Sequence, residues 1–235
     1  MFFKKLISGD NKNRRKTRFH DERGGKIDLK YYPNLIRSIK SNLQKRITST
    51  PPSYPWLPYS ATNFILRYFK EIKGKNILEF GAGYSTIFFS ENLANIYSKE
   101  DNSDWFKFLK NKIVSKKICN PKLEFAEDKG HYLKISKDWP DKYDLILVDG
   151  SWRDECLPIA FEKTKKNSLI VLDNSDKFAL NDYYKYPEDL TGNVFKAREE
   201  LKKYAENKRL TIKQFVDFSP CNLYVHECML VICQE

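Results

Sequence analysis

The sequence predicts a doubly wound α/β fold with a mostly parallel sheet of seven strands. From about residue 75 onward, short apolar segments alternate with amphipathic segments of helical periodicity. The segments at 143–148 and 168–172 are almost continuously apolar, which is typical of parallel strands covered by helices on both faces. A length of 235 residues suits one such domain with additional segments.

The expected elements follow in order along the chain. Strands are predicted at 76–80, 95–99, 122–126, 143–148, 168–172, 211–218 and 224–232, and helices at 85–93, 103–115, 154–163 and 194–205. No helix separates the last two strands, so they should form an antiparallel C-terminal hairpin at the sheet edge. In a Rossmann-like arrangement of this kind, ligands bind beyond the carboxyl ends of the strands, where the strand order reverses.

A basic N-terminal helical extension precedes this body. Residues 1–50 contain 14 Lys and Arg against 4 Asp and Glu, a net charge of +10, whereas residues 51–235 contain 28 and 27, a net charge of +1. We predict a partly flexible extension over 1–50, with a helix near 31–47, and the main domain over 51–235. The charge indicates an anionic partner such as nucleic acid, a phosphorylated glycan or a lipid head group, with a solvated tail as the alternative.

Composition argues against several classes of protein. No apolar run approaches the roughly 18 residues that a membrane span needs, and the N-terminus turns polar too soon for a secretory signal, so we expect a cytoplasmic protein. Five cysteines without a CxxC pair predict neither a disulfide framework nor a structural zinc site.

The sharpest motif is ILEFGAGYST at 77–86, where an apolar strand runs into two glycines and then a helix. Gly81 and Gly83 permit a tight turn and the close approach of a ligand to the helix N-terminus. Thr86 replaces the third glycine of the NAD fingerprint, and Glu79 suits a ligand with an ammonium group. S-adenosylmethionine (SAM) carries an ammonium and a sulfonium cation but no phosphate, so these residues indicate SAM.

Acidic residues also end the following predicted strands. Glu100 lies 19 residues after Gly81, the spacing at which such folds bind ribose hydroxyls. Two strongly apolar strands end in Asp149 and in Asp173-Asn174, and acids in such positions are costly to bury unless they bind something. The topology therefore brings these carboxylates to one edge of the sheet.

From about residue 54 to 233 the chain resembles class I SAM-dependent methyltransferases, FkbM-like members most of all. The resemblance rests on SYPW, ILEFGAGYST, YSKEDNSDW, YDLILVDGSWRDEC, SLIVLDNSDK and FVDFSPCNLYVHECML. It implies SAM as the cofactor and a hydroxyl of a small molecule or glycan as the methyl acceptor. The implied cofactor contacts are Glu79, Gly81 and Gly83 at the methionine end, Glu100 at the ribose, Asp128 and its neighbour Glu127 near the adenine, and Asp149 beside the transferred methyl group.

Three strand-end residues also resemble the metal ligands of catechol-type O-methyltransferases, namely Asp149, Asp173 and Asn174. Two carboxylates and an amide oxygen suit Mg²⁺ or Ca²⁺, and such a metal would orient the acceptor hydroxyl and lower its pKa. The sequence departs from that family because Trp152-Arg153 stands where a lysine is expected. In the alternative interpretation, Asp173 and Asn174 cap the next segment and pair with Arg153.

Asp149 is the first candidate for the base that takes the acceptor proton, and His226 and His131 are the others. Tyr54 and Trp56 follow a proline-rich stretch, from which they are candidates to cover the SAM site. Residues 175–195, which include Tyr183, Tyr184 and Tyr186, are expected to set acceptor specificity.

Three other functions stay open at this point. A nucleic-acid methyltransferase would use the basic extension as a clamp, although Asp149 is followed by Gly150-Ser151 and not by the Pro-Pro-Tyr run of amino-directed enzymes. A non-catalytic protein would bind SAM without turnover. An NAD-dependent dehydrogenase is disfavoured by the incomplete glycine fingerprint.

Overall fold

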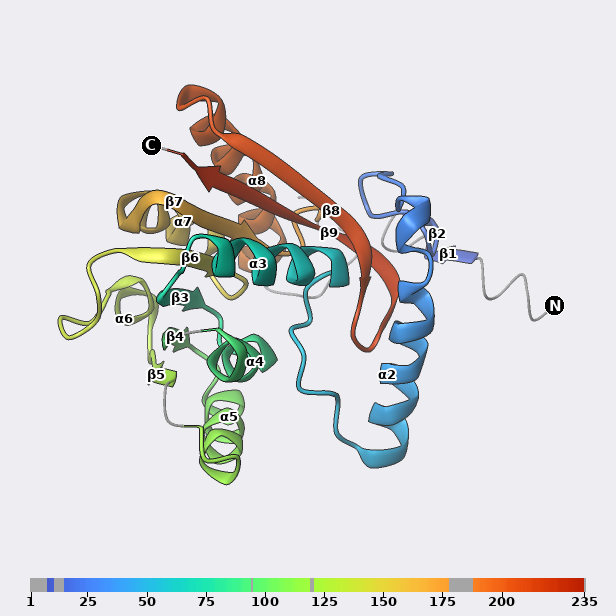
Figure 1. The fold of residues 1–235 in the computed structure, drawn as a ribbon, viewed down its shortest axis with the longest axis horizontal. Helices are drawn as coiled ribbons and strands as arrows, with labels where there is room; N and C mark the ends of the chain where they lie inside the picture. Colours follow the sequence, from blue (N-terminus) through green and yellow to red (C-terminus); the bar gives the residue numbers. More distant parts are fainter. Residues whose placement is uncertain (1–7, 11–14, 94, 119–120, 178–187, 235) are drawn as a thin grey trace.

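The computed structural model describes residues 8–10, 15–93, 95–118, 121–177 and 188–234. Seven strands form one sheet in the order β5-β4-β3-β6-β7-β9-β8, with helices on both faces (Figure 1). The predicted fold class is confirmed, including the antiparallel hairpin at the edge. The parallel strands are β3 (Asn76–Phe80), β4 (Asn95–Glu100), β5 (Pro121–Phe125), β6 (Tyr143–Val148) and β7 (Thr164–Leu172), and the antiparallel pair is β8 (Thr211–Ser219) and β9 (Asn222–Cys233).

Successive side chains along each strand point to opposite faces of the sheet and pack into two separate cores. Leu78 and Ile146 face one core, whereas Ile77 and Leu145 face the other, as the two-residue period of a strand requires. The first core lies under α6 (Lys129–Leu133), α7 (Arg153–Lys163) and α8 (Glu188–Asn207). The second lies under α3 (Tyr59–Glu71) and α4 (Tyr84–Asn92), and α5 (Ser103–Ser115) packs beside α4.

The described part of the basic extension packs on the β8–β9 hairpin. It contains β1 (Ser8–Asp10), β2 (Arg15–Thr17), η2 (Leu29–Tyr31) and α2 (Asn34–Thr48), and α2 lies along the right-hand side of Figure 1. Ile27 shares a small core with Phe218 and Val225. The amide of Asn42 donates to the carbonyl of Cys221 at 3.1 Å. The division of the chain near residue 50 and the flexibility of the extension remain predictions.

Within the described ranges, no helix is long and apolar enough to cross a bilayer.

Candidate active site

A cavity of about 400 Å³ lies at the carboxyl ends of β3, β4 and β6. The strand order reverses between β3 and β6, which is where doubly wound sheets bind their ligands. The volume falls in the range of small-molecule sites. The residues that line this first cavity are Trp56, Gly81, Ala82, Gly83, Tyr84, Ser85, Glu100, Asp101, Trp105, Asp149, Gly150, Ser151, Arg153 and Asn174.

The glycine turn forms the floor of the first cavity. Gly81 has a φ of 94°, a conformation that L side chains rarely adopt, and a Cβ there would lie 2.5 Å from the Cα of Gly150. The loops after β3 and β6 therefore touch backbone to backbone. Gly83 has extended backbone, and a Cβ there would make ordinary contacts with the Oγ and the backbone nitrogen of Ser85, at 3.4 and 3.9 Å. Gly81 is therefore required by its backbone conformation and by close packing, whereas Gly83 leaves open space beside the cavity.

Glu79 lies behind the glycine turn, and its predicted contact with the cofactor stays a prediction. Its side chain is fully buried and accepts hydrogen bonds from the hydroxyls of Ser85, Thr86 and Ser98, each at 2.5 Å. It is not among the residues that line the cavity. Burial raises its pKa to about 7, although the three hydroxyl donors oppose that shift. In this structure, Glu79 fastens the start of α4 and the next strand to the glycine turn.

Glu100 lines the first cavity at the end of β4, and its predicted contact with the ribose stays a prediction. One oxygen, Oε1, accepts the N–H of Asn102 at 2.8 Å, which fixes the carboxylate at the cavity wall. Burial raises the pKa of Glu100 to about 7, and nearby Asp101 adds to the shift. Across the cavity, the hydroxyl of Ser151 donates to Asp101 at 2.7 Å and joins the loops after β4 and β6.

Asp149, at the end of β6, is held by the first helical residue that follows it. The Arg153 guanidinium lies 3.3 Å from the Asp149 carboxylate and also donates to the backbone carbonyls of Asp149, Gly150 and Asp173 at 2.6–3.0 Å. Burial and the charge of Asp173 raise the pKa of Asp149, and Arg153 opposes the rise. A carboxylate of raised pKa in a fixed position has the properties of a general base.

A second cavity, of about 240 Å³, adjoins the first on the side of the β8–β9 turn. The two cavities share Trp56, Asp149 and Asn174. The structure therefore brings both predicted catalytic residues, Asp149 and His226, to one cavity. The other residues that line it are Lys45, Asp173, Ser219, Pro220, Cys221 and Asn222.

His226 on β9 is buried against Asp173 at the end of β7. Its Nε2 lies 3.3 Å from an Asp173 carboxylate oxygen. Burial lowers the pKa of His226, but the charge and the hydrogen bond of Asp173 more than offset this, so the pKa lies above its usual value. A protonated His226 would therefore form an ion pair with Asp173 and could not accept a further proton, which leaves Asp149 as the first candidate for the base.

The predicted Mg²⁺ ligands are near one another, but each carboxylate already has a partner. Asp149 pairs with Arg153, and Asp173 pairs with His226. Arg153 also donates to the backbone carbonyl of Asp173, which corresponds in part to the alternative interpretation. Among the described residues, no group of three or more His, Cys, Asp and Glu side chains is arranged to hold a metal ion. The structure thus gives Mg²⁺ no support.

Of the other predicted residues, Asp128, His131 and Tyr54 line neither cavity. The carboxylate of Asp128 accepts the N–H of His131 at 2.8 Å and caps α6, a helix that the sequence did not predict. The His131 ring is bound to Glu124 at 2.8 Å and lines neither cavity. Trp56 lines both cavities, whereas Tyr54 packs against Tyr59. Tyr183, Tyr184 and Tyr186 lie outside the described residues.

Lys45 was not predicted to belong to the site. It lies on α2 in the basic extension, lines the second cavity, and has its ammonium group 5.4 Å from the centre of the Trp56 ring. No motif marks this lysine, because it reaches the cavity through the packing of α2 on the β8–β9 turn.

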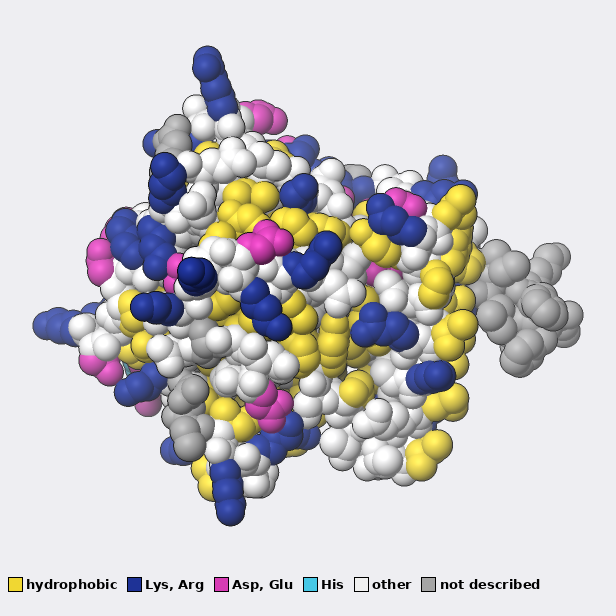
Figure 2. Space-filling view, in the orientation of Figure 1, with side chains coloured by type: hydrophobic (Ala, Val, Ile, Leu, Met, Phe, Trp, Pro, Cys, Tyr) yellow, Lys and Arg dark blue, Asp and Glu magenta, His cyan; other side chains and the backbone are white. Residues whose placement is uncertain are grey.

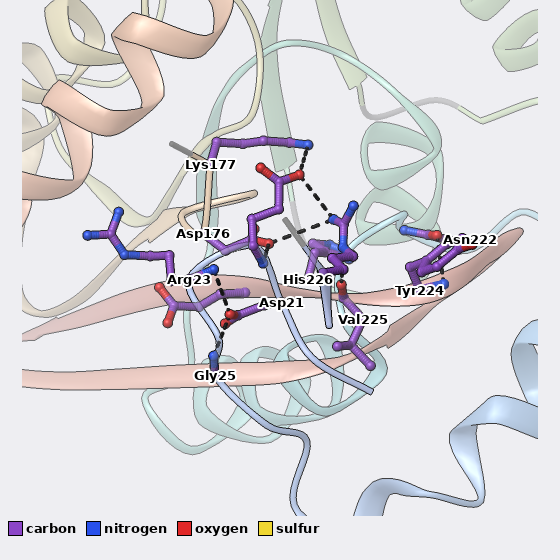
Figure 3. Close-up of polar contacts among 12 residues, drawn as sticks. Asp21, Arg23, Gly25, Asp176, Lys177, Asn222, Tyr224, Val225 and His226 are labelled. Carbon is purple, nitrogen blue, oxygen red and sulfur yellow. Dashed lines mark hydrogen bonds and ion pairs between the residues drawn. The ribbon is translucent and has the colours of Figure 1, made fainter. Parts of the chain in front are cut away.

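A buried charged network ties the N-terminal segment to the strands beside the second cavity (Figure 3). Arg15 lies 3.3 Å from Glu22 and 3.8 Å from Asp176, and Lys177 pairs with Glu22 at 2.5 Å. Close by, a carboxylate oxygen of Asp21 accepts the N–H groups of Arg23 and Gly25, at 2.9 and 2.6 Å. The segment from Arg15 to Gly25 is thereby held against the loop after β7 and against β9.

The pKa of Asp21 gives this network a pH dependence. Burial and the charge of Asp176 raise the pKa to about 6 from 3.8. Because the folded state holds this proton more tightly than the unfolded state, stability falls as pH rises from about 4 to about 6 and stays lower above.

Asp21→Asn, which keeps the oxygen acceptor without the charge, should therefore raise the free energy of unfolding at pH 7.5 by about 1–2 kcal/mol. Urea unfolding of both proteins at pH 5 and pH 7.5 measures this, with exposed Asp28→Asn as the control. An Asp21→Asn variant that is less stable than the wild type at pH 7.5 would contradict the proposed repulsion between Asp21 and Asp176.

Comparison with solved structures places the fold among methyltransferases. An O-methyltransferase from Bacillus cereus, in complex with SAH, is 16% identical, with 85% of this chain and 90% of that chain covered and a TM-score of 0.59. A putative caffeoyl-CoA O-methyltransferase from Staphylococcus aureus is 15% identical over 88% and 100%, with a TM-score of 0.62. The O-methyltransferase TomG from Streptomyces achromogenes, involved in tomaymycin synthesis and solved with SAM, is 14% identical over 100% and 95%, with a TM-score of 0.59.

At these identities the likeness shows the fold. The chain has the fold of the class I SAM-dependent methyltransferases. No protein-family model and no curated protein matches the sequence.

Proposed function

We propose that this chain is a SAM-dependent O-methyltransferase, with SAM in the first cavity and a hydroxylated small molecule or glycan in the second. One observation carries the proposal: the two cavities meet at Asp149, at the end of β6. A methyl donor and an acceptor must lie in line with each other, and two adjoining cavities at the topological switch point can hold them so.

The chemistry of the first cavity supports SAM as the cofactor. Glu100 presents a carboxylate that can accept ribose hydroxyls, and Asp101 adds a negative charge that suits a cationic ligand. Tyr84 and Trp105 supply aromatic surface, and the Trp105 indole N–H is bound to the Ala82 carbonyl at 2.7 Å, which fixes the ring. When bound, SAM supplies an electrophilic methyl group, which the acceptor hydroxyl attacks as the carbon–sulfur bond breaks.

The protein's task is to position the acceptor and remove its proton. Asp149 takes the hydroxyl proton at its carboxylate; its pKa of about 8 makes the ionised carboxylate a strong proton acceptor, and the ionised fraction grows as pH rises through that value. Arg153 positions Asp149 through the ends of β6 and β7. The need for a base favours a hydroxyl acceptor, because a neutral amine attacks without losing a proton first.

The named structural neighbours support the same reaction, because the three proteins compared above are described as O-methyltransferases and two were solved with SAM or SAH. We also propose that the chain is related most closely to FkbM-like enzymes and that it is cytoplasmic. A nucleic-acid acceptor, non-catalytic SAM binding and a requirement for Mg²⁺ are the alternatives that the following experiment separates.

The test is to incubate the protein with SAM and a panel of hydroxylated aromatics, sugars and total RNA, and to measure SAH formation. We expect SAH to form with members of the hydroxylated set in the presence of EDTA. Activity that EDTA removes and Mg²⁺ restores would establish the metal, and methylation of RNA alone would assign the nucleic-acid alternative. SAM binding with no turnover on any acceptor would contradict catalysis.

A further inference from the structure

Helix α2 is oriented against the usual rule, because it buries serines and exposes aliphatic side chains. Ser38 and Ser41 are buried, and they hydrogen-bond to the β8–β9 turn at Asn222 and Cys221. On its outer side, Ile36, Ile39, Leu43 and Ile47 are 58%, 36%, 51% and 80% exposed. A surface helix normally does the reverse, so the exposed residues, here called the outer stripe, call for a partner.

The outer stripe is continuous along the helix. At about 100° per residue, its four side chains fall within about 80° of one another, on the side opposite Ser38. Lys40 and Arg46 flank the stripe on its two sides. Figure 2 shows hydrophobic side chains along the right-hand edge, where Figure 1 places α2, with Lys and Arg side chains beside them.

The positive charge of α2 indicates which kind of partner the outer stripe binds. The helix contains Arg37, Lys40, Lys45 and Arg46 and no acidic residue, and two of these cations, Lys40 and Arg46, lie beside the outer stripe. A second copy of the same helix would bring like charges together, and nucleic acid would leave the aliphatic side chains in water. An anionic bilayer surface satisfies both features, because its head groups attract the cations and its acyl boundary accepts the aliphatic side chains.

We propose that the outer stripe binds the surface of an anionic lipid bilayer, with α2 lying parallel to it. The inner side of the same helix supplies Lys45 to the second cavity. Binding in this way would place that cavity close to the lipid surface. The proposal stands independently of the reaction that the cavities perform, because its measurement is lipid binding.

The test is flotation of the full chain with vesicles of phosphatidylcholine alone or with about one third phosphatidylglycerol. We expect the wild type to float only with the anionic vesicles, and less at high salt. Ile39→Gln/Leu43→Gln should weaken vesicle binding at least tenfold, and Lys40→Gln/Arg46→Gln by about tenfold or more. Val114→Gln, which alters a 70% exposed aliphatic residue on α5, should bind like the wild type.

Circular dichroism and thermal unfolding establish whether the variants fold. If Ile39→Gln/Leu43→Gln does not fold, Ile47→Gln near the end of α2 takes its place. Failure of the wild type to bind anionic vesicles would overturn the proposal, as would equal binding by the stripe variants. A concentration-dependent dimer in light scattering that Ile39→Gln/Leu43→Gln abolishes would assign the stripe to a second copy instead.

Discussion

Asp149→Asn is expected to lower kcat by about 10²- to 10⁴-fold, the contribution typical of a positioned general base. The asparagine keeps an oxygen near Arg153, 3.3 Å from the carboxylate in the wild type, so the local structure should persist. SAM affinity should change by only a few-fold. Single-turnover and steady-state measurements of SAH formation check this, with the exposed Asp141→Asn as the matched control.

The pH profile separates a base from a residue that only shapes the cavity. Since Asp149 must be ionised to accept a proton, and since its pKa is raised, wild-type kcat should rise with pH through that raised pKa. Asp149→Asn should lose this dependence. A variant that retains both a high kcat and the same pH profile would move the base elsewhere, with His226 as the next candidate.

Gly81→Ala is expected to have the larger effect on folding. A methyl group at this position meets the backbone of Gly150 at 2.5 Å, and the φ of 94° is strained for any L side chain. Neither backbone can move freely, because each ends a buried strand. We expect a loss of about 3 kcal/mol in the free energy of unfolding and loss of SAM binding.

Gly83→Ala is the matched control, because its methyl group finds 3.4 Å of space beside Ser85. Its stability should lie within about 1 kcal/mol of the wild type, since the backbone there is extended. Any loss of SAM affinity in this variant would then report a direct contact with the ligand. Urea unfolding and calorimetry measure the two quantities, and equal stability of Gly81→Ala and the wild type would contradict the packing argument.

Much of the fold could be predicted because the strands are marked by their own residues. The segments that form β3 and β6 are mostly apolar and are buried on both faces, and their boundaries agree with the prediction. Polar residues hid the beginning of β7, where Thr164–Asn167 extend the strand beyond the apolar run. Helix α6 has five residues, too few for periodicity to appear.

Residues of the candidate site could be predicted where their position at the end of a strand places them in the cavity. Glu100 and Asp149 line the first cavity because they end parallel strands, whose carboxyl ends share one edge. Glu79 occupies a similar position, but the hydroxyls of Ser85, Thr86 and Ser98 surround it and keep it out of the cavity. That outcome depends on packing between three elements, which a linear motif does not encode.

Lys45 is a residue of the candidate site that the sequence did not predict. It comes from the basic extension, more than 100 residues before Asp149 in the sequence. It reaches the second cavity because polar residues of α2, such as Asn42, hydrogen-bond to the β8–β9 turn. Such contacts between distant segments leave no pattern in the sequence.

The most direct test of the account is calorimetric titration of SAM, and separately of NAD⁺, into the wild type and Glu100→Ala, with Glu91→Ala as an exposed control. We predict micromolar SAM binding, about −8 kcal/mol, more than tenfold weaker in Glu100→Ala and unchanged in Glu91→Ala. Because the pKa of Glu100 is about 7, affinity should also fall from pH 8 to pH 6 as its carboxylate is protonated. Absence of SAM binding by the folded wild type, or binding of NAD⁺ in its place, would contradict the assignment of the first cavity to SAM.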